Sequence, residues 1–485
     1  MEHVVTYDET QLAVINCEDP LVIAQAKAGA GKTSTAIGKA AAFPDERFLY
    51  ICFNKSVQEE AQRRFGPNVS CRTTHSLAWA AVGRHYGARV NMKWGPRLLA
   101  DELALARPRI AAVARAALSE FFSTSDQLPG MDHVQAVSQH WMLDSVEQAH
   151  AVDAVKRAWA GMLDLKSHVS LPPDAYLKMW SLSKPQLRFP RIILDEAQDT
   201  PPVVAEVIKQ QRAKMLLLGD SFQGIYAWRG AKDAMRDFAE SGRATVLQMP
   251  KTWRFGERTA TIANEILGRL RGETTKIVGM GQDDPRRRRP VSVLARTNAV
   301  LFGVAAERRG KGVMWIGSSK GYRMDLIADA YYLFAGQRHQ INDPIMRRYE
   351  SWHQYVDEAE ASKDPEARIL IKVVASFGHD IPALVGDIRS NEVHAAEDAD
   401  IILSTGHKGK GLTLDYVRVA DDFECLYDAE EELKQFGKLS VASAQEIHLL
   451  YVAFTRARFH AELNRETKEW FEGKGIVLPG GGTAS

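Results

Sequence analysis

The chain has 485 residues, of which 45% are hydrophobic and 25% are charged, and its formal net charge is +1. This composition is that of a folded globular protein, and the length predicts two to four domains. The near-neutral charge neither favours nor excludes nucleic acid, because a groove that binds phosphates needs only a local cluster of Lys and Arg.

The first informative segment is glycine-rich: residues 26–33 read Ala-Lys-Ala-Gly-Ala-Gly-Lys-Thr. An apolar run, residues 21–25, precedes it and a helix-compatible stretch, residues 35–42, follows it, which is typical of a P-loop that binds phosphate at a helix N-terminus. We expect Lys32 to reach the β- and γ-phosphates and Thr33 to hold Mg²⁺. Because the first residue of the segment is alanine where the pattern has glycine, a chance Ala/Gly-rich loop is the alternative. The predicted nucleotide-binding loop comprises Ala28, Gly29, Ala30, Gly31, Lys32, Thr33 and Ser34.

A second apolar run, residues 191–194, ends abruptly in Asp195 and Glu196. Buried strands rarely end in two adjacent carboxylates without a chemical reason. We predict that Asp195 binds Mg²⁺ and that Glu196 acts as general base on the attacking water. An acidic first helical turn ahead of Pro201 is the alternative.

Along the chain, apolar runs alternate with helix-compatible stretches, as in parallel sheets covered by helices on both faces. We predict an α/β fold with two RecA-like P-loop NTPase domains that face each other across the nucleotide, each interrupted by a mainly helical insertion. Apolar residues at helical spacing support the first insertion; they occur at residues 98–117 and 146–162. The strands expected in the first domain are residues 21–24, 48–53, 192–194 and 215–218; those expected in the second are 245–249, 291–295, 401–404 and 417–419, with helices near 257–271 and 443–457. The predicted boundaries are 1–75 with 186–243 for the first motor domain, 76–185 for its insertion, 244–335 with 400–485 for the second motor domain and 336–399 for its short insertion.

Three later segments carry motifs in a fixed order. Residues 219–231 read Gly-Asp-Ser-Phe-Gln-Gly-Ile-Tyr-Ala-Trp-Arg-Gly-Ala, residues 253–256 read Trp-Arg-Phe-Gly, and residues 451–457 read Tyr-Val-Ala-Phe-Thr-Arg-Ala. Together with Leu-Asp-Glu-Ala-Gln-Asp at 194–199, they resemble the motifs of superfamily 1 DNA helicases of the UvrD, Rep and PcrA type, from Gln11 to Arg456. Segments 53–56, 176–185 and 419–423 look most similar to the helicase core of the F-box DNA helicase family. No F-box is expected, because the motor begins close to Met1.

This resemblance implies roles around the nucleotide. Gln11 is similar to the glutamine that contacts adenine, and Trp253 stands where the family stacks an aromatic ring on the base. Gln223 matches the residue that senses the γ-phosphate and its attacking water. Arg254 and Arg456 match arginines that reach the transition state, where such a residue can contribute a rate factor of about 10³ to 10⁵. The predicted catalytic residues are Lys32, Asp195, Glu196, Gln223, Arg254 and Arg456.

Two positions depart from the family pattern. Thr413 follows the motif at residues 405–412 where the family has glutamate, so the nucleotide contact of that glutamate is not carried over. Cys52 stands where UvrD-type motors often place a phenylalanine near DNA, while the neighbouring Phe53 agrees with the F-box helicase pattern.

The resemblance also implies a DNA path. Trp228 would stack on a base close to Gln223, so that stacking and hydrolysis are mechanically near each other. Stacking a base on an aromatic ring contributes about 1–3 kcal/mol and a DNA stacking step averages about 1.4 kcal/mol, so exchanging them is nearly neutral. The alternative is that Tyr226 and Trp228 are core aromatics. The predicted DNA-binding residues are Asn54, Lys55, Thr73, Thr74, His75, Tyr226, Trp228, Arg296, His407 and Lys408. The four-arginine run at residues 286–289 is interpreted as a solvated loop.

These features predict an ATP- and Mg²⁺-dependent DNA helicase that translocates on single-stranded DNA and unwinds duplexes with 3′ to 5′ polarity, in DNA repair or recombination. Its expected partners are single-stranded DNA and duplexes with a single-stranded tail. An ATP-driven translocase that removes recombinase, single-strand-binding protein or other bound proteins is the alternative, which the F-box helicase resemblance suggests. A small-molecule P-loop kinase and a catalytically inert nucleic-acid-binding module are disfavoured by the paired arginines and the complete set of catalytic residues.

Cysteine usage and hydropathy predict the compartment. The four cysteines are widely spaced and form no C-x-x-C pair, so we expect neither a zinc site nor a disulfide framework. We also expect no membrane span of about 18 apolar residues and no signal segment. The prediction is a cytoplasmic protein in a bacterium or phage, or a nuclear protein in a eukaryote.

Overall fold

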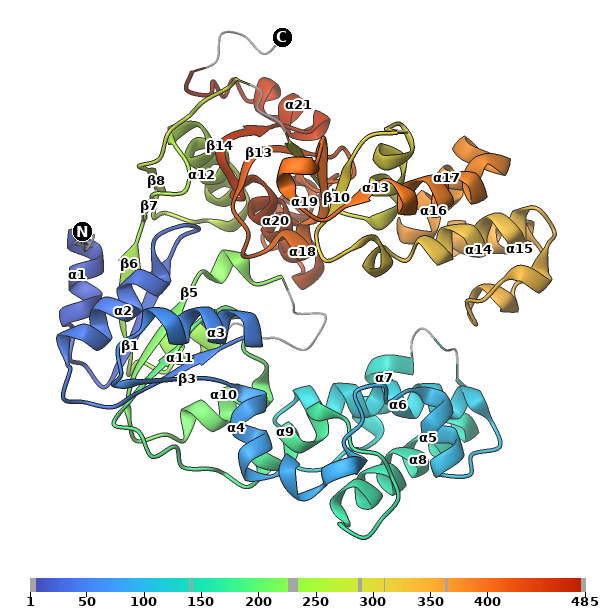
Figure 1. Ribbon diagram of the computed structural model, residues 1–485, viewed down its shortest axis with the longest axis horizontal. Helices are drawn as coiled ribbons and strands as arrows, with labels where there is room; N and C mark the ends of the chain where they lie inside the picture. The colour runs from blue at the N-terminus through green and yellow to red at the C-terminus, as the bar shows by residue number, and fades with distance from the viewer. Residues whose placement is uncertain are drawn as a thin grey trace. The chain divides into compact units, whose positions relative to one another are not determined.

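The computed structural model describes residues 6–138, 141, 143–225, 234–286, 290–308, 310–362 and 365–480. The chain forms two compact units, one of residues 1–27 and 31–249 and the other of residues 28–30 and 250–485. Each unit contains one six-stranded parallel sheet flanked by helices (Figure 1). The expected α/β fold with two parallel sheets is therefore confirmed.

The first sheet has the strand order β3-β2-β4-β5-β1-β6, and every neighbouring pair is parallel. Strands β2 and β4 are buried at every residue, which explains their continuous apolar sequences. Because parallel strands end at the same edge, the segments that follow β1, β2, β3, β4 and β5 meet there. The strands are β1 (Leu21–Ala26), β2 (Phe48–Cys52), β3 (Val69–Thr73), β4 (Arg191–Leu194), β5 (Lys214–Gly219) and β6 (Thr245–Met249).

The prediction that residues 245–249 belong to the second sheet is wrong. Strand β6 pairs with β1 along its whole length, with Val22 opposite Thr245 and Ala26 opposite Met249. Its side chains alternate between partly buried and exposed, as expected of an edge strand. Alternation of this kind predicts a strand but does not predict which sheet it joins, because pairing is a tertiary property.

Helices of the first unit cover this sheet, and α1, α3 and α4 begin at side-chain caps. Helix α1 begins with a capping box. The backbone N–H of Gln11 donates to the Asp8 carboxylate at 3.1 Å, and the backbone N–H of Asp8 donates to the side-chain oxygen of Gln11 at 3.1 Å. Helix α2 begins at Lys32, directly after Gly31 and three residues before the expected helical stretch 35–42. The helices are α1 (Glu9–Asn16), α2 (Lys32–Ala42), α3 (Lys55–Arg64), α4 (Thr74–Ala81), α10 (Pro202–Lys209) and α11 (Ala234–Glu240).

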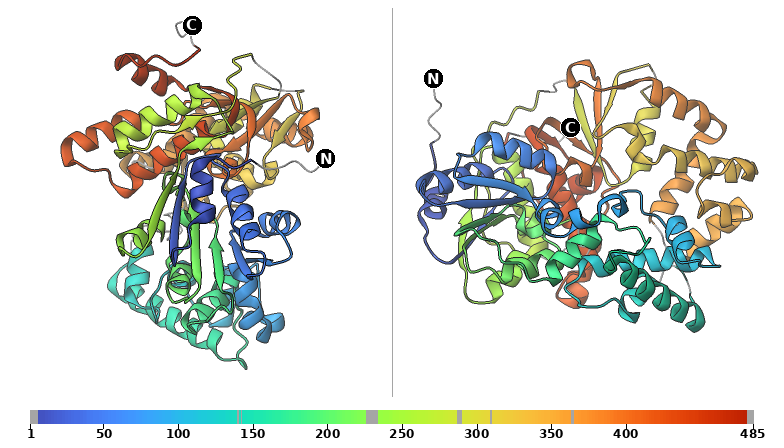
Figure 2. Two further views of the ribbon diagram at one scale, coloured as in Figure 1. Left: turned by 90° about the vertical axis from the view of Figure 1, so that its left-hand side faces the viewer. Right: turned by 60° about the horizontal axis from the view of Figure 1, so that its bottom comes forward.

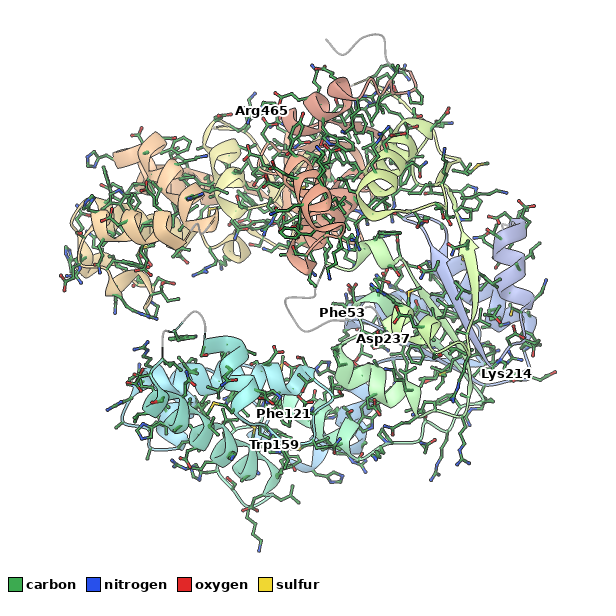
Figure 3. All side chains as sticks on the ribbon, turned by 180° about the vertical axis from the view of Figure 1, so that it is seen from behind. Phe53, Phe121, Trp159, Lys214, Asp237 and Arg465 are labelled. Atoms are coloured by element: carbon green, nitrogen blue, oxygen red, sulfur yellow. The ribbon has the colours of Figure 1, made fainter. Side chains whose placement is uncertain are left out.

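The first insertion is a helical bundle, as expected, and its helices lie side by side in the views of Figure 2. In its interior the rings of Phe121 and Trp159 meet edge to face with centroids 5.1 Å apart (Figure 3). The stretch 98–117 is not one helix, because the chain turns at Ala104, which has a φ of 51°, and a new helix starts at Pro108, where proline is favoured. The bundle comprises α5 (Pro96–Glu102), α6 (Pro108–Ser123), α7 (Met131–Ser138), α8 (Ser145–Leu163) and α9 (Pro173–Leu182).

The second unit is built on a parallel sheet with the order β11-β10-β12-β9-β13-β14, beside a two-stranded ribbon of β7 and β8. The predicted helix near 443–457 ends at Phe454, and after a two-residue turn the chain enters a strand, β14, that the sequence did not predict. Strand β11 lies inside the stretch expected to be the short helical insertion. The strands are β7 (Lys251–Thr252), β8 (Val278–Gly279), β9 (Val291–Ala295), β10 (Val313–Trp315), β11 (Glu392–Val393), β12 (Ile401–Thr405), β13 (Leu414–Val419) and β14 (Ala457–Glu462).

Helices of the second unit pack on the sheet and form a second cluster at α14 to α17, near the expected short insertion (Figure 1). The predicted helix near 257–271 is confirmed with the same bounds. The helices are α12 (Glu257–Arg271), α13 (Asn298–Ala306), α14 (Met324–Phe334), α15 (Trp352–Ser362), α16 (Pro365–Phe377), α17 (Ile381–Ser390), α18 (Gly406–Gly409), α19 (Leu426–Phe436), α20 (Val441–Phe454) and α21 (Arg465–Gly473).

One stretch of the described chain, Ala367–Ser390, is apolar and long enough to cross a membrane, with a mean hydropathy of 1.5. The expectation that no apolar run reaches this length is therefore corrected. The stretch is divided at Gly378, which has a φ of 45°, into helices α16 and α17 of 13 and 10 residues. Neither helix alone reaches the roughly 20 residues that a spanning helix needs.

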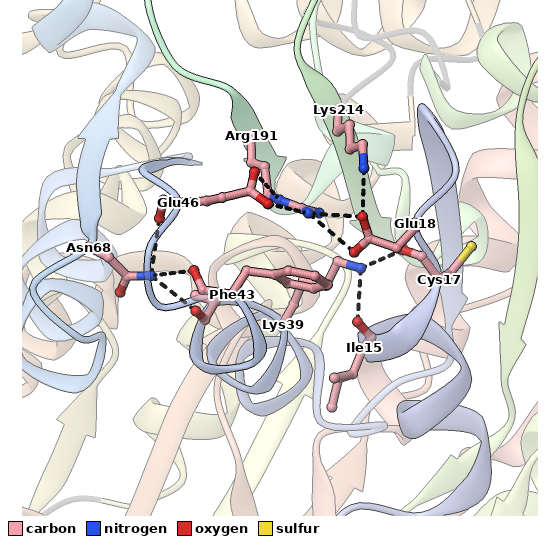
Figure 4. A network of polar contacts seen from close by, with 10 residues as sticks. Ile15, Cys17, Glu18, Lys39, Phe43, Glu46, Asn68, Arg191 and Lys214 are labelled. Carbon is pink, nitrogen blue, oxygen red and sulfur yellow. Dashed lines mark hydrogen bonds and ion pairs between the residues drawn. The ribbon is translucent and has the colours of Figure 1, made fainter.

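An ion-pair network joins the amino ends of the first sheet's strands (Figure 4). The Arg191 side chain, at the start of β4, is 4% exposed and pairs with Glu46 at 2.7 Å and with Glu18 at 3.0 Å. Lys214, at the start of β5, reaches Glu18 at 2.6 Å. Lys39 in α2 donates to the carbonyl oxygen of Ile15 at 2.8 Å. The network ties α1, α2, β4 and β5 together at the end of the sheet opposite the glycine-rich loop.

Candidate functional site

The glycine-rich loop leaves β1 and enters α2, and two of its glycines have a backbone that other residues rarely adopt. Gly29 and Gly31 have φ angles of 77° and 79°. A Cβ atom on Gly31 would lie 2.6 Å from Nε2 of Gln11, which is itself 4% exposed. The first unit therefore brings Gln11, the predicted adenine contact, against the loop. Ala28, Gly29 and Ala30 are grouped with the second unit, where Trp253 donates its backbone N–H to the carbonyl oxygen of Gly29 at 3.3 Å.

Lys32 and Glu196 meet in the first unit. Nζ of Lys32, in the first turn of α2, lies 3.2 Å from Oε1 of Glu196, which follows β4. Burial opposes the charge on Lys32, but the carboxylates of Glu196, Asp195 and Asp220 outweigh it and raise the pKa of the lysine. Thr33 and Ser34 follow in the same turn and are partly buried. The structure thus places the predicted phosphate-binding lysine beside the predicted general base.

Asp195 and Glu196 differ in environment. Burial and the neighbouring Glu196 charge raise the pKa of Asp195 to about 6, while Lys32 and a hydrogen bond from Tyr50 oppose the shift. Glu196 has a φ of 50°, a left-handed conformation that costs a non-glycine residue about 1–3 kcal/mol and that clusters at active sites. The conformation turns the chain sharply after β4, and the N–H of Glu196 donates to Oδ1 of Asp195 at 3.0 Å.

A hydrogen-bond chain connects the predicted base to the predicted γ-phosphate sensor. Nε2 of Gln198 donates to Glu196 at 2.6 Å, and Oε1 of Gln198 accepts the backbone N–H of Asp220 at 3.1 Å. Oδ2 of Asp220 in turn accepts from Nε2 of Gln223 at 2.8 Å. All three connecting side chains are buried, at 2% for Gln198, 1% for Asp220 and 4% for Gln223. Sequence reasoning did not single out Gln198 or Asp220, although both lie inside the quoted motifs.

Gly219 explains why the chain can pass so close to this network. A Cβ atom there would lie 2.3 Å from Oε1 of Gln198 and 2.4 Å from Sδ of Met235. Only glycine leaves room for the Gln198 side chain at the end of β5. Gly219 is therefore required for close packing, and not for a backbone conformation that only glycine adopts.

The oxygen donors near Lys32 suit Mg²⁺. A carboxylate at Asp195 and a hydroxyl at Thr33 are the ligand types that this cation prefers, and it usually keeps several waters and few protein ligands. Among the described residues, no group of three or more His, Cys, Asp and Glu side chains gathers as a metal site. A site of one carboxylate, one hydroxyl and substrate phosphates agrees with that finding.

The second unit brings the two predicted arginines to one residue, Thr455. Nη1 of Arg254 donates to the Thr455 carbonyl oxygen at 3.1 Å, and Nη2 of Arg456 donates to its hydroxyl at 3.2 Å. Arg456 is 1% exposed and also donates from Nε to the carbonyl oxygen of Val452 at 3.0 Å. Trp253, beside Arg254, is 45% exposed. The arginines are thus neighbours, with Arg456 held by backbone carbonyl groups of its own unit.

Several predicted DNA contacts lie at the carboxyl edge of the first sheet. Asn54 caps α3, because its side-chain oxygen accepts the N–H of Val57 at 2.9 Å, and Thr73 caps α4 through Ser76 at 3.1 Å. The Lys55 side chain is 84% exposed. The capping roles occupy the side-chain oxygens of Asn54 and Thr73, which sequence reasoning did not anticipate.

A cleft of about 760 Å³ in the first unit gathers residues from the ends of three strands and from the first insertion. His75 lies in it, with Nε2 3.0 Å from Asp174 of α9. Phe53 is 55% exposed, whereas Cys52 is buried and burial raises its pKa to about 12. Of these two adjacent residues, Phe53 is the one whose side chain reaches the surface. The predicted residues that line the cleft are Thr74, His75, Asp195 and Glu196.

In the second unit, predicted DNA contacts are engaged within the protein. Arg296 forms a two-pronged ion pair with Glu446 at 2.8 and 2.9 Å. Lys408 donates to the carbonyl oxygen of Gly321 at 2.7 Å, and His407 beside it is partly buried. Tyr226 and Trp228 lie outside the described residues, as do three arginines of the run at 286–289. Arg286, the described one, pairs with Asp284 at 2.8 Å.

Comparison with known proteins agrees with this arrangement. Residues 160–239 match the family described as UvrD/REP helicase N-terminal domain. The chain is 31% identical over 475 residues to F-box DNA helicase 1 of Gallus gallus, covering 90% of this chain and 46% of that protein. It is 27% identical over 520 residues to F-box DNA helicase protein 1 of Schizosaccharomyces pombe, covering 94% and 58%. A shorter match, 31% over 90 residues, covers 18% of this chain and 12% of DNA helicase II of Haemophilus influenzae.

The chain spans about half the length of the two F-box helicases that it matches. Within that span the motif at residues 194–199 begins at the end of β4, the motif at residues 219–231 begins at the end of β5, and the motif at residues 451–457 lies at the end of α20. These similarities, which extend over most of the chain, support a UvrD-like helicase core of superfamily 1.

Proposed function

We propose that the protein is an ATP-dependent DNA helicase that translocates 3′ to 5′ on single-stranded DNA and unwinds duplexes. The observation that supports it best is the connected chain from Lys32 through Glu196 to Gln223 in the first unit. A P-loop lysine, a general base and a γ-phosphate sensor in one hydrogen-bond network form hydrolysis machinery rather than a binding surface. The polarity and a role in repair or recombination rest on the family resemblance.

In this proposal the phosphate loop and the α2 N-terminus bind the β- and γ-phosphates, and Lys32 neutralises their charge. Thr33 and Asp195 hold Mg²⁺, which when bound neutralises phosphate charge. Glu196 takes the proton of the attacking water. Gln198 holds the Glu196 carboxylate in place, and Asp220 orients the Gln223 amide.

Arg254 and Arg456 are proposed to stabilise the transition state, and Gln11 and Trp253 are proposed to contact adenine. Single-stranded DNA is proposed to follow Phe53, Asn54 and Lys55 and the residues 73–75. Lys55 is the residue best placed to contact phosphate, since its side chain is 84% exposed. Contacts of this kind position a strand without reading its sequence.

ATP turnover measured with and without single-stranded DNA, followed by strand displacement on duplexes with 3′ or 5′ tails, tests the proposal. We expect DNA to stimulate turnover and the 3′-tailed duplex alone to be unwound. Lys32→Ala is the control and should lose turnover. An ATP hydrolysis rate that does not change when DNA is added would instead indicate a small-molecule kinase or another P-loop enzyme.

A further inference from the structure

Tyr50 is a buried tyrosine in the middle of β2, a strand that is otherwise Phe, Leu, Ile and Cys. Its side chain is 0% exposed, and its ring lies 4.7 Å from that of Phe65 between centroids. A buried hydroxyl needs a hydrogen-bond partner, because leaving it unsatisfied is costly. The Tyr50 hydroxyl donates to Oδ2 of Asp195.

Strand pairing fixes this contact. Strands β2 and β4 are neighbours, with Tyr50 opposite Ile193, and the N–H of Asp195 donates to the carbonyl oxygen of Ile51 at 3.0 Å. The backbone of Asp195 is therefore held by the ladder that carries Tyr50. A tyrosine at this register reaches the tip of β4 with its hydroxyl.

Both oxygens of the Asp195 carboxylate are consequently held. Oδ2 accepts from Tyr50, and Oδ1 accepts the N–H of Glu196 at 3.0 Å. Each carboxylate oxygen has about two lone-pair sites, so one site on each remains for a cation or its water. The two donors, one a side chain and one a backbone group, fix the plane of the carboxylate.

We propose that Tyr50 is a positioning residue for the divalent-cation site, acting through the orientation of the Asp195 carboxylate. The inference rests on the proposed role of Asp195 as a Mg²⁺ ligand. Hydrogen bonds to a metal-binding carboxylate typically change metal affinity by about 10- to 100-fold when they are lost. Tyr50 touches neither nucleotide nor DNA in this role.

Binding of Mn²⁺ in the presence of ADP, followed by electron paramagnetic resonance, measures the site without catalysis. Tyr50→Phe removes only the hydroxyl and should weaken Mn²⁺ binding about tenfold. Tyr322→Phe is the matched control: Tyr322 is also 0% exposed, but its hydroxyl donates to the carbonyl oxygen of Ile316 at 2.8 Å in the second unit. The control should bind Mn²⁺ as the wild type does.

A Tyr50→Phe protein that binds Mn²⁺ within twofold of wild type overturns the inference. Asp195→Asn separates this failure from failure of the proposed cation site, since Mn²⁺ binding that survives Asp195→Asn shows that Asp195 is not a ligand. A double-mutant cycle with Asp195→Glu gives the second measurement. In that background the carboxylate has moved, so Tyr50→Phe should cost no more than about twofold; a full tenfold loss there would mean that the hydroxyl acts through general packing.

Discussion

Replacing Arg191 by methionine should destabilise the first unit by about 2–3 kcal/mol. The arginine is 4% exposed and donates from Nε to Glu46 at 2.8 Å and from Nη2 to Glu46 at 2.7 Å and to Glu18 at 3.0 Å. Breaking a buried ion pair costs about 3–5 kcal/mol. The partner side chains of Glu18 and Glu46 are 45% and 40% exposed, so water replaces part of the lost interaction and the expected loss falls below that range, to about 2–3 kcal/mol.

The effect should depend on pH. Hydrogen bonds from Lys214 and Arg191 lower the pKa of Glu18 to about 2, and the hydrogen bond from Arg191 lowers that of Glu46. A carboxylate whose pKa is lowered by folding stabilises the fold fully above its unfolded pKa, near 4.5, and loses this contribution as the pH falls towards the folded value. Wild type and Arg191→Met should therefore differ most at neutral pH and converge between about pH 4.5 and 2.

Hydrogen exchange at pH 7, resolved by peptide, separates the two units. A loss of 2–3 kcal/mol should speed exchange of globally protected amides in β4 and β5 by roughly 30- to 150-fold, while β9 and β12 serve as an internal reference. Arg236→Met is the control, because the Arg236 and Glu240 side chains are 72% and 64% exposed and such pairs contribute about 0.5 kcal/mol or less. Urea midpoints at pH 7 and pH 3 test convergence. Unchanged protection in β4 of Arg191→Met would refute the reasoning.

Three further predictions concern the site. Glu196→Gln should retain ATP binding but lower single-turnover hydrolysis by about 10²- to 10⁴-fold, because the water loses its base; hydrolysis at the wild-type rate would remove Glu196 from that role. Gly219→Ala should place a methyl group 2.3 Å from Oε1 of Gln198, so overpacking should lower the stability by about 1–3 kcal/mol and kcat about tenfold. A thermal melt and an ATPase assay on one preparation measure the two effects. Unchanged values would mean that the Gln198 side chain moves freely. Lys55→Ala should weaken single-stranded DNA binding equally for all sequences. It should also reduce the slope of log binding constant against log salt concentration by about 0.7, as measured by fluorescence anisotropy. An unchanged slope would mean that Lys55 does not contact the DNA.

The phosphate loop and the strand that ends in Asp195 could be predicted from sequence, because each combines a local pattern with a chemical requirement. The strand at 245–249 was placed in the wrong sheet, since neighbouring segments along a chain need not pair. Strand β14 was missed for a different reason. Only Thr455 and Arg456 separate it from the end of α20, and its residues alternate too weakly between buried and exposed to distinguish a strand from the end of a helix.

Gln198 and Asp220 show the limit for site residues. Both are polar residues inside recognisable motifs, but the hydrogen bond between them spans 22 positions of sequence, and only the pairing of β4 with β5 brings them together. Tyr50 could not be predicted as a site residue either, because an aromatic residue in a buried strand is normally part of the hydrophobic core. Only the structure places its hydroxyl beside Asp195. Capping by Asn54 and Thr73 could have been predicted, since each stands immediately before a helix.

The burial of Cys52 has a practical consequence for attaching spectroscopic probes. Burial raises the pKa of Cys52 to about 12 and that of Cys71 to about 11, and Cys425 is also buried, so few thiolates are present at neutral pH to react with maleimides. Cys17 is the most accessible of the four thiols. Replacing Cys17 by serine would leave only poorly reactive native thiols. A cysteine introduced on an exposed helix would then carry a single fluorophore.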